Sequence, residues 1–240
     1  RLTAEAADFI ARLTFADLPA EALRIGKRCL LDGLGVILAG STEPCAGIVR
    51  DLAVRDGGRP EATVFGRPPQ RLPAAAAALV NGTAGHALDW DDTQLSTTPD
   101  RTFGLLTHPT IPPLAAGLAL AEARGGVSGR DFLTAFLAGF EVECKIAEAI
   151  RPTHYQRGFH TSGTIGIFGA AAAAGRLLGL DAARLRRMLG IAASMGAGLR
   201  CNFGTMTKPL HVGRAAQNGV TAARLAAAGY EADPAGLDGP

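Results

Sequence analysis

The chain has 240 residues, 48% of them hydrophobic, so it is long enough to bury a substantial core as one large domain or two small ones. Its 24 Lys and Arg residues nearly balance its 22 Asp and Glu residues, and the formal charge of +2 excludes a broad basic field that would attract nucleic acid or an anionic membrane. The four cysteines form no CxxC pair, which argues against a disulfide framework or a thiolate zinc site and favours a reducing cytoplasm.

No targeting or membrane segment is expected. Glu5 and Asp8 interrupt the apolar pattern at the N-terminus, which argues against a signal peptide. The most apolar stretch, residues 163–175, is ended by Arg176 and is too short and too rich in glycine to span a bilayer. We therefore expect it to be a buried helix.

Helical periodicity dominates the first half of the chain. Residues 3–13 predict an amphipathic helix capped by Thr3, and residues 19–40 predict a long helix in which Asp32 lies inside an apolar run. A buried Asp32 needs a partner, either as hydrogen-bonded structure or as a group that supports a site. Residues 61–65 read as a short strand, and residues 72–87 return to helix.

That helix runs into the densest polar cluster of the chain, residues 81–93 with the sequence NGTAGHALDWDDT. Three carboxylates, an indole and a hydroxyl follow one another over residues 89–93. Because proton transfer needs groups of this kind, we expect chemistry here, with Asp91 and Asp92 holding the turn. The same acids can also bind a hard cation, but EF-hand spacing and a His pair at i, i+4 are both missing, so no metal is predicted.

The second half predicts five further helices separated by irregular segments. A polar loop at residues 94–106 precedes a helix that starts with prolines after His108 and ends near residue 125. Ser128 and Asp131 predict a capping box for a helix reaching residue 150, on which Glu141 and Glu143 are expected to face solvent. Helices are then expected at residues 163–178, after the cap Asp181, and at residues 208–228.

Three basic residues stand at or just before helix starts, where backbone N–H groups and the helix dipole favour an anion: His108, His160 and Lys208. His211 follows Lys208 at i+3 on the same face. If these helix starts converge, they form a pocket for a substrate with several carboxylates, with Asp89 as a base and Thr93 as a hydrogen-bond partner. The alternative is that each is a solvated cap, and Cys201, near Lys208, has no assigned base and reads as structural.

Four ordered motifs resemble one family, MmgE/PrpD. They are HALDWDDT at 86–93, HPT at 108–110, GFHTSGTIGIFGAAAAAGRLLGLD at 158–181 and GTMTKPLHVGRAAQNGV at 204–220. The resemblance covers essentially the whole chain. It implies an all-α, multi-helix bundle-like domain that forms a homodimer, and a C-terminal α/β domain that this chain lacks. Residues 1–230 would be the helical domain and residues 231–240 the start of the linker.

The resemblance also implies a chemistry: loss or exchange of a group next to a carboxylate, without metal or organic cofactor. It implies that Asp89, His108 and His160 are catalytic residues and that Thr93 and Lys208 bind the substrate. We add the neighbouring His211 to the substrate-binding residues. Further groups would come from the second domain. The first expectation is a lyase similar to 2-methylcitrate dehydratase, acting on a small di- or tricarboxylate.

Alternatives of the same family are a cis-aconitate decarboxylase or an iminodisuccinate epimerase. Two departures from the family pattern keep the substrate open: the link from Thr93 to His108 is long, and Thr161 stands where proline often follows GFH. A non-catalytic helical dimerisation module and a metal-dependent hydrolase using Asp89, Asp91 and Asp92 also remain.

Overall fold

The computed structural model describes residues 1–95, 105–150 and 152–239, and most of these residues lie in helices. The helices are α1 (Leu2–Arg12), α2 (Ala20–Gly40), α3 (Pro44–Asp56), α4 (Ala74–Gly85), α5 (Ile111–Arg124), α6 (Gly129–Ala149), α7 (Thr153–Gln156), α8 (Thr161–Thr164), α9 (Gly166–Leu177), α10 (Ala182–Met195) and α11 (Thr207–Ala227). Short 3-10 turns occur at Phe15–Asp17 and Arg200–Asn202. The predicted all-α class is confirmed.

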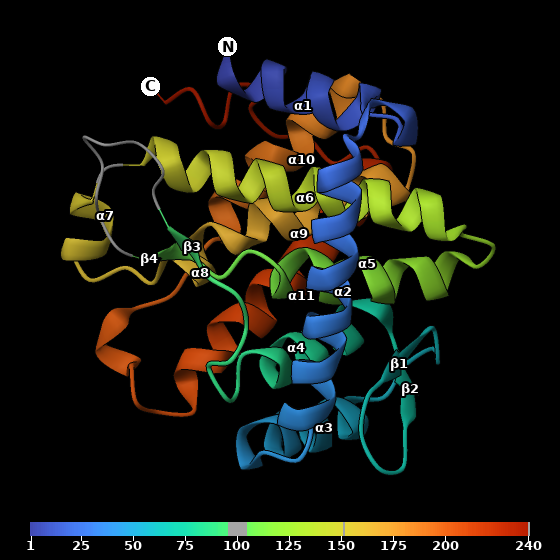
Figure 1. The fold of residues 1–240 in the computed structure, drawn as a ribbon, viewed down its shortest axis with the longest axis vertical. Coiled ribbons are helices and arrows are strands. Elements are labelled where there is room, and N and C mark those ends of the chain that lie inside the picture. Colours follow the sequence, from blue (N-terminus) through green and yellow to red (C-terminus); the bar gives the residue numbers. More distant parts are fainter. Residues whose placement is uncertain (96–104, 151, 240) are drawn as a thin grey trace.

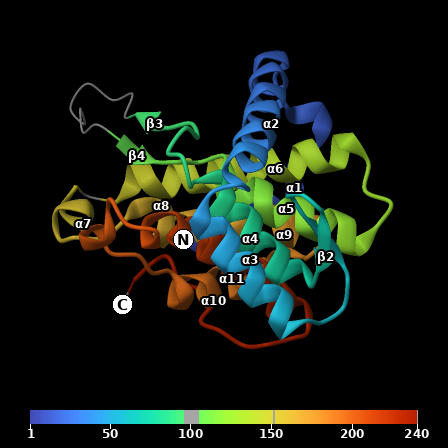
Figure 2. The same ribbon diagram turned by 90° about the horizontal axis from the view of Figure 1, so that it is seen from below.

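The centre of the fold is α11, which packs against α4 on one side and α9 on the other. α5 and α6 pack on α9, and α10 lies between α11 and α1. α2 runs across the outside of this bundle over α4, α5 and α6 (Figure 1). From below, the hairpin of β1 (Ala62–Val64) and β2 (Gln70–Leu72) lies on the other side of the bundle from α7 and α8 (Figure 2). Among the described residues, no helix combines the length and hydrophobicity needed to cross a membrane.

Small residues allow the central helices to approach closely. A Cβ added at Gly213 of α11 would overlap the hydroxyl of Thr83 and the carbonyl of Leu79 on α4. A Cβ added at Gly219 would lie 2.7 Å from the backbone nitrogen of Ala171 on α9. The Ala- and Gly-rich composition therefore sets the spacing of the core helices, since any larger side chain would push them apart.

Two of the three predicted helix caps are present. The hydroxyl of Ser128 accepts a hydrogen bond from the Asp131 N–H at 3.1 Å, and the Asp181 carboxylate accepts one from the Arg184 N–H at 2.8 Å. The predicted cap at Thr3 is wrong, because α1 begins one residue earlier and Thr3 is buried inside it, donating to Asp238 at 3.0 Å.

The strand predicted at residues 61–65 is confirmed as β1 (Ala62–Val64), which pairs antiparallel with β2 (Gln70–Leu72). β2 was missed because the apolar run that follows it predicted a helix from residue 72. β3 (Gln94–Leu95) and β4 (Leu105–Thr107) also pair, at both ends of the predicted loop 94–106. Residues 96–104 of that loop lie outside the described residues.

Two expectations about acidic residues are wrong. Asp32 is exposed, because α2 turns Gly26, Gly33 and Ile37 toward its neighbours and Asp32 lies on the opposite face. Glu143 was expected to face solvent but is fully buried between α6 and α9, where it accepts a hydrogen bond from the Thr107 hydroxyl at 2.7 Å. Helical periodicity alone did not show which face of α2 or α6 is covered.

The last described residues fold back on the helical bundle. Asp238 binds the N-terminal ammonium group and the N–H of Leu2, and Gly236 packs against Gly190 of α10. The two ends of the chain therefore lie near each other (Figure 1). The domain boundary at residue 230 stays a prediction.

Candidate active site

The polar cluster at residues 86–93 begins where α4 ends. His86 is the C-cap of α4, and the chain then turns through Asp89, which has a positive φ of 57°. Aspartate is one of the few residues with a side chain that adopts this left-handed conformation readily. The turn separates the two carboxylates that follow the helix: Asp91 is buried, whereas Asp89 is exposed.

Residues from four separate segments converge on one pocket of about 330 Å³. Five of the six predicted site residues line it, which confirms that the helix starts converge. The lining residues are Asp89, Thr93, His108, Tyr155, His160, Thr161, Ser162, Phe203 and Lys208. His211 is the exception, because it lies behind His160 and is not part of this lining.

Among the described residues that line the pocket, the one cation is Lys208, in the first turn of α11. Its ammonium group donates to the Asp89 carboxylate and lies 5.4 Å from the centre of the Phe203 ring. Burial by itself raises the pKa of Asp89, but the hydrogen bond and the charge of Lys208 outweigh it and leave the pKa below its usual value. Asp89 is therefore ionised at neutral pH and holds the Lys208 ammonium at the pocket.

Two buried imidazoles form the opposite wall. His108 and His160 are 4% and 3% exposed, and burial lowers the pKa of both, that of His160 to about 2. Both rings are therefore neutral at pH 7 in the empty pocket. The Nδ1 atom of His160 lies 3.0 Å from the Nδ1 of His211, so one of these nitrogens donates and the other accepts.

The structure places His211 behind His160, and its substrate-binding role stays a prediction. Its i+3 spacing from Lys208 is right, but its ring is buried against His160 and Gly198 instead of sharing the Lys208 side of the pocket. From this position it fixes the orientation of His160. A direct contact between His211 and a substrate is not supported by the geometry.

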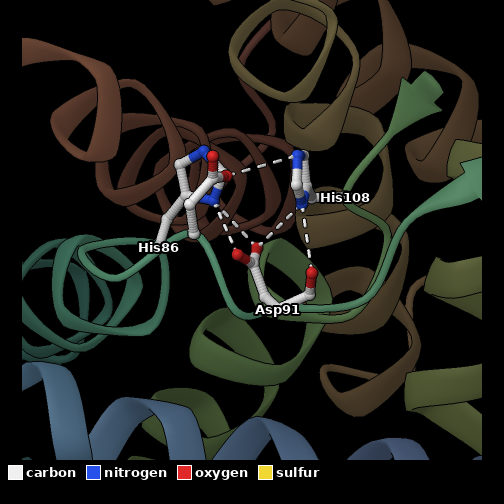
Figure 3. Close-up of side chains that lie close together, drawn as sticks. His86, Asp91 and His108 are labelled. Atoms are coloured by element: carbon white, nitrogen blue, oxygen red, sulfur yellow. Dashed lines mark hydrogen bonds and ion pairs between the residues drawn. The ribbon is translucent and has the colours of Figure 1, made fainter. Parts of the chain in front are cut away.

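Several pocket residues were not predicted. Tyr155 lines it from the four-residue helix α7 and Phe203 from the end of the 3-10 turn Arg200–Asn202, and segments this short have no periodicity that marks a side chain as facing inward. Ser162 lies in the motif GFHTSGT, and its hydroxyl accepts a hydrogen bond from the backbone N–H of His108 at 3.2 Å. Asp91 was expected to hold the turn, but its buried carboxylate contacts the rings of His86 and His108 (Figure 3).

A metal-binding geometry exists among the described residues. Donor atoms of His86, Asp89, Asp91 and His108 all lie within 4.8 Å of one another. The Lys208 ammonium already contacts Asp89, so a divalent cation there would meet a like charge. The absence of a catalytic metal stays a prediction, which elemental analysis of the purified protein tests.

Comparison with known proteins gives one family. The MmgE/PrpD N-terminal domain matches residues 4–240. A human cis-aconitate decarboxylase is 35% identical over 241 residues, covering 99% of this chain and 48% of that protein. The mouse protein of the same name is 36% identical and one from Aspergillus terreus is 31% identical, over 90% and 96% of this chain and 43% and 46% of theirs. The chain spans about half the length of the curated relatives it matches.

Proposed function

The chain belongs to the MmgE/PrpD family, and we propose that the protein carrying it is a lyase that decarboxylates a small tricarboxylate similar to cis-aconitate. The sequence motifs put a dehydratase first and a decarboxylase second. The named relatives are cis-aconitate decarboxylases, and they favour the second reading. An epimerase of the same family remains the further alternative.

The observation that carries the proposal is the pairing of one cation with two neutral imidazoles in one pocket. Lys208 faces the pocket with a charge that suits a substrate carboxylate, and Thr93 adds a hydroxyl. His108 and His160 provide nitrogen atoms that can take up or deliver a proton. Asp89 orients the Lys208 ammonium.

These groups suit the steps of a decarboxylation. The bond between carbon and a carboxylate breaks, CO2 leaves, and the electron pair that remains on carbon is stabilised by a neighbouring carboxylate bound to Lys208. A proton from solvent, carried by an imidazole, then reaches that carbon. The balance is one proton consumed for each CO2 released. The pocket walls bury both imidazoles, which keeps water away from the carbanion-like state.

Lys208→Ala in the complete protein tests the proposal. We expect kcat/KM for cis-aconitate, measured from the rate of CO2 release, to fall about 10²- to 10³-fold, because an anion-binding charge is lost. Lys145→Ala removes an exposed lysine of α6 and serves as the matched control with unchanged kinetics. An unchanged kcat/KM in Lys208→Ala would remove Lys208 from the site.

The substrate alternatives are separated in the same assay. Turnover of 2-methylcitrate or of iminodisuccinate instead of cis-aconitate would replace the decarboxylase by the dehydratase or the epimerase. A complete protein that turns over none of the three would favour a non-catalytic helical module.

We also propose that the protein is a homodimer. Large apolar side chains are exposed on α2 and α3, among them Leu31, Leu38, Ile48 and Leu52. Exposed apolar faces of this kind are typical of subunit interfaces, and light scattering gives the mass in solution. A cytoplasmic location, no nucleic-acid or membrane partner, and no organic cofactor likewise stay proposals from the sequence.

A further inference from the structure

The Asp91 carboxylate lies between two imidazole rings beneath the pocket (Figure 3). Both of its oxygens are 2.9 Å from the Nδ1 of His86, and Oδ2 is 3.4 Å from the Nδ1 of His108. The side chains of His86 and Asp91 are 0% and 1% exposed. Asp91 therefore cannot contact a substrate in the pocket. It can influence the reaction only through the ring of His108.

The contacts of Asp91 decide where His108 carries its proton. The Nδ1 of His108 faces the Asp91 carboxylate and also the Asp91 backbone carbonyl, 3.4 Å away. Both neighbours are acceptors, so Nδ1 must carry the hydrogen of the neutral ring. Nε2 then has the free lone pair. This nitrogen is turned toward the pocket side, 3.7 Å from the Asp89 carboxylate, which is already bound by Lys208.

His86 holds Asp91 in this position. A carboxylate buried this deeply is stable only if donors reach it, and the His86 Nδ1–H reaches both oxygens. The ring of His86 also lies edge-on to the ring of His108, with centroids 4.6 Å apart at 70°, so it limits the rotation of His108. Asp91 and His86 therefore fix both the tautomer and the orientation of one pocket histidine.

We propose that Asp91, supported by His86, is a positioning residue that presents the unprotonated Nε2 of His108 to the substrate and stabilises the imidazolium formed when Nε2 takes up a proton. The proposal rests on the proposed function, in which His108 carries a proton to the substrate carbon. It assigns His108 the uptake of that proton from solvent, and it makes the buried pair the reason why this histidine, whose side chain is 5% exposed, can carry a charge during turnover.

The same three residues, together with Asp89, also have donor atoms close enough together for a metal site. A metal ion bound between Asp91 and the two rings would need the lone pairs of the Nδ1 atoms, whereas the proposed arrangement has hydrogen on both. The two readings therefore predict opposite protonation of His86 and His108. One measurement of the imidazole nitrogens separates them.

The first experiment is nitrogen NMR of the complete protein labelled with ¹⁵N-histidine at neutral pH, with the His108 signals identified by their loss in His108→Gln. We expect a pyrrole-type signal for Nδ1 and a pyridine-type signal for Nε2. The opposite tautomer, or a metal-shifted Nδ1, would overturn the proposal. Because this measurement needs no turnover, it remains decisive if the proposed activity is absent.

The second experiment compares Asp91→Asn with Asp92→Asn. An amide at position 91 has a single acceptor oxygen and an NH2 group that opposes one of the imidazole N–H groups. We expect kcat to fall about 10²-fold or more with little change in KM, and the His108 signals to show mixed tautomers. Asp92 is the matched control, because it lies in the same turn but, among the described residues, accepts hydrogen bonds from the backbone N–H and hydroxyl of Thr110, at 3.2 and 2.7 Å.

The outcomes separate the two proposals. A loss of kcat and of the single tautomer in Asp91→Asn, with neither lost in Asp92→Asn, supports the positioning role. A folded Asp91→Asn with unchanged kcat and unchanged His108 signals overturns it. If Asp91→Asn does not fold, His86→Gln takes its place, because it removes only the residue that supports Asp91. We expect this variant to lower kcat less than about 10²-fold and to show mixed tautomers of His108. An unchanged His108 tautomer in His86→Gln also overturns the proposal. A wild-type protein that shows the expected tautomer but no activity leaves His108 oriented and refutes the function alone.

Discussion

The helical core and the pocket wall are both buried, and they are built in opposite ways. Where α4 and α9 cross α11, the closest contacts join backbone atoms and small side chains, such as those of Thr83 and Ala170. At the pocket, the segment that follows α4 and the segments that precede α5 and α8 bring together His86, Asp91, His108 and His160 within a few ångströms. α11 joins the two regions, because it carries Lys208 at its start and Gly213 and Gly219 further on.

The difference shows how a small-residue core serves a charged site. Burying carboxylates and imidazoles costs free energy unless each has a partner at the right distance. Helices in close backbone contact have little freedom to slide, so they hold these partners in place. The contrast therefore predicts that core changes act on stability, whereas changes at the pocket act on protonation.

The largest effect is expected from Gly213→Ala. The added methyl group overlaps Thr83 and Leu79, so α4 and α11 must separate, and we expect a loss of about 3 kcal/mol or more in the free energy of unfolding measured with urea. Gly47→Ala in α3 is the control, because a Cβ there meets nothing closer than 4.0 Å and helix propensity improves. Similar stability of both variants would show that the core is not closely packed.

A smaller, pH-dependent effect is expected at Asp92. Burial raises the pKa of Asp92 from 3.8 to about 6. The nearby charge of Asp91 adds to this rise, whereas the hydrogen bonds from Thr110 oppose it. Between pH 3.8 and pH 6 the folded protein therefore keeps a proton on Asp92 that the unfolded chain has released. The binding of this proton stabilises the fold fully below pH 3.8, and this contribution is lost as the pH rises through 6.

Asp92→Asn removes the free-energy cost of burying an ionised Asp92 carboxylate at neutral pH. Relative to wild type, the variant should gain about 1–3 kcal/mol at pH 7 and much less at pH 4, as measured by urea unfolding at both pH values. An equal effect at the two pH values would mean that Asp92 is ionised throughout, and the pocket wall would then tolerate charge better than the contrast with the core implies.

The smallest effect is expected from Glu143→Gln. Complete burial raises the pKa of Glu143 well above its usual value, which favours the neutral acid, and glutamine keeps the oxygen that accepts from Thr107. We expect a change under about 1 kcal/mol in thermal unfolding, as for Glu141→Gln on the exposed face of α6. A loss above about 3 kcal/mol would show that Glu143 is a buried anion whose charge stabilises the fold.

The sequence by itself determined most helices, two of the caps, the family and five residues of the pocket lining. These follow from local rules, because periodicity, capping spacing and proline or glycine positions act within a few residues. Asp89, His108, His160 and Lys208 stand out because an ionisable residue at a helix end is visible without knowing its neighbours.

Only the tertiary structure decided what those residues face. Asp32 is exposed and Glu143 buried because the packing of α2 and α6 selects one face of each helix. His211 supports His160 from behind, and Asp91 reaches a histidine 17 residues further along the chain. Such contacts depend on how whole helices are placed in space, and no local pattern in the sequence encodes that placement.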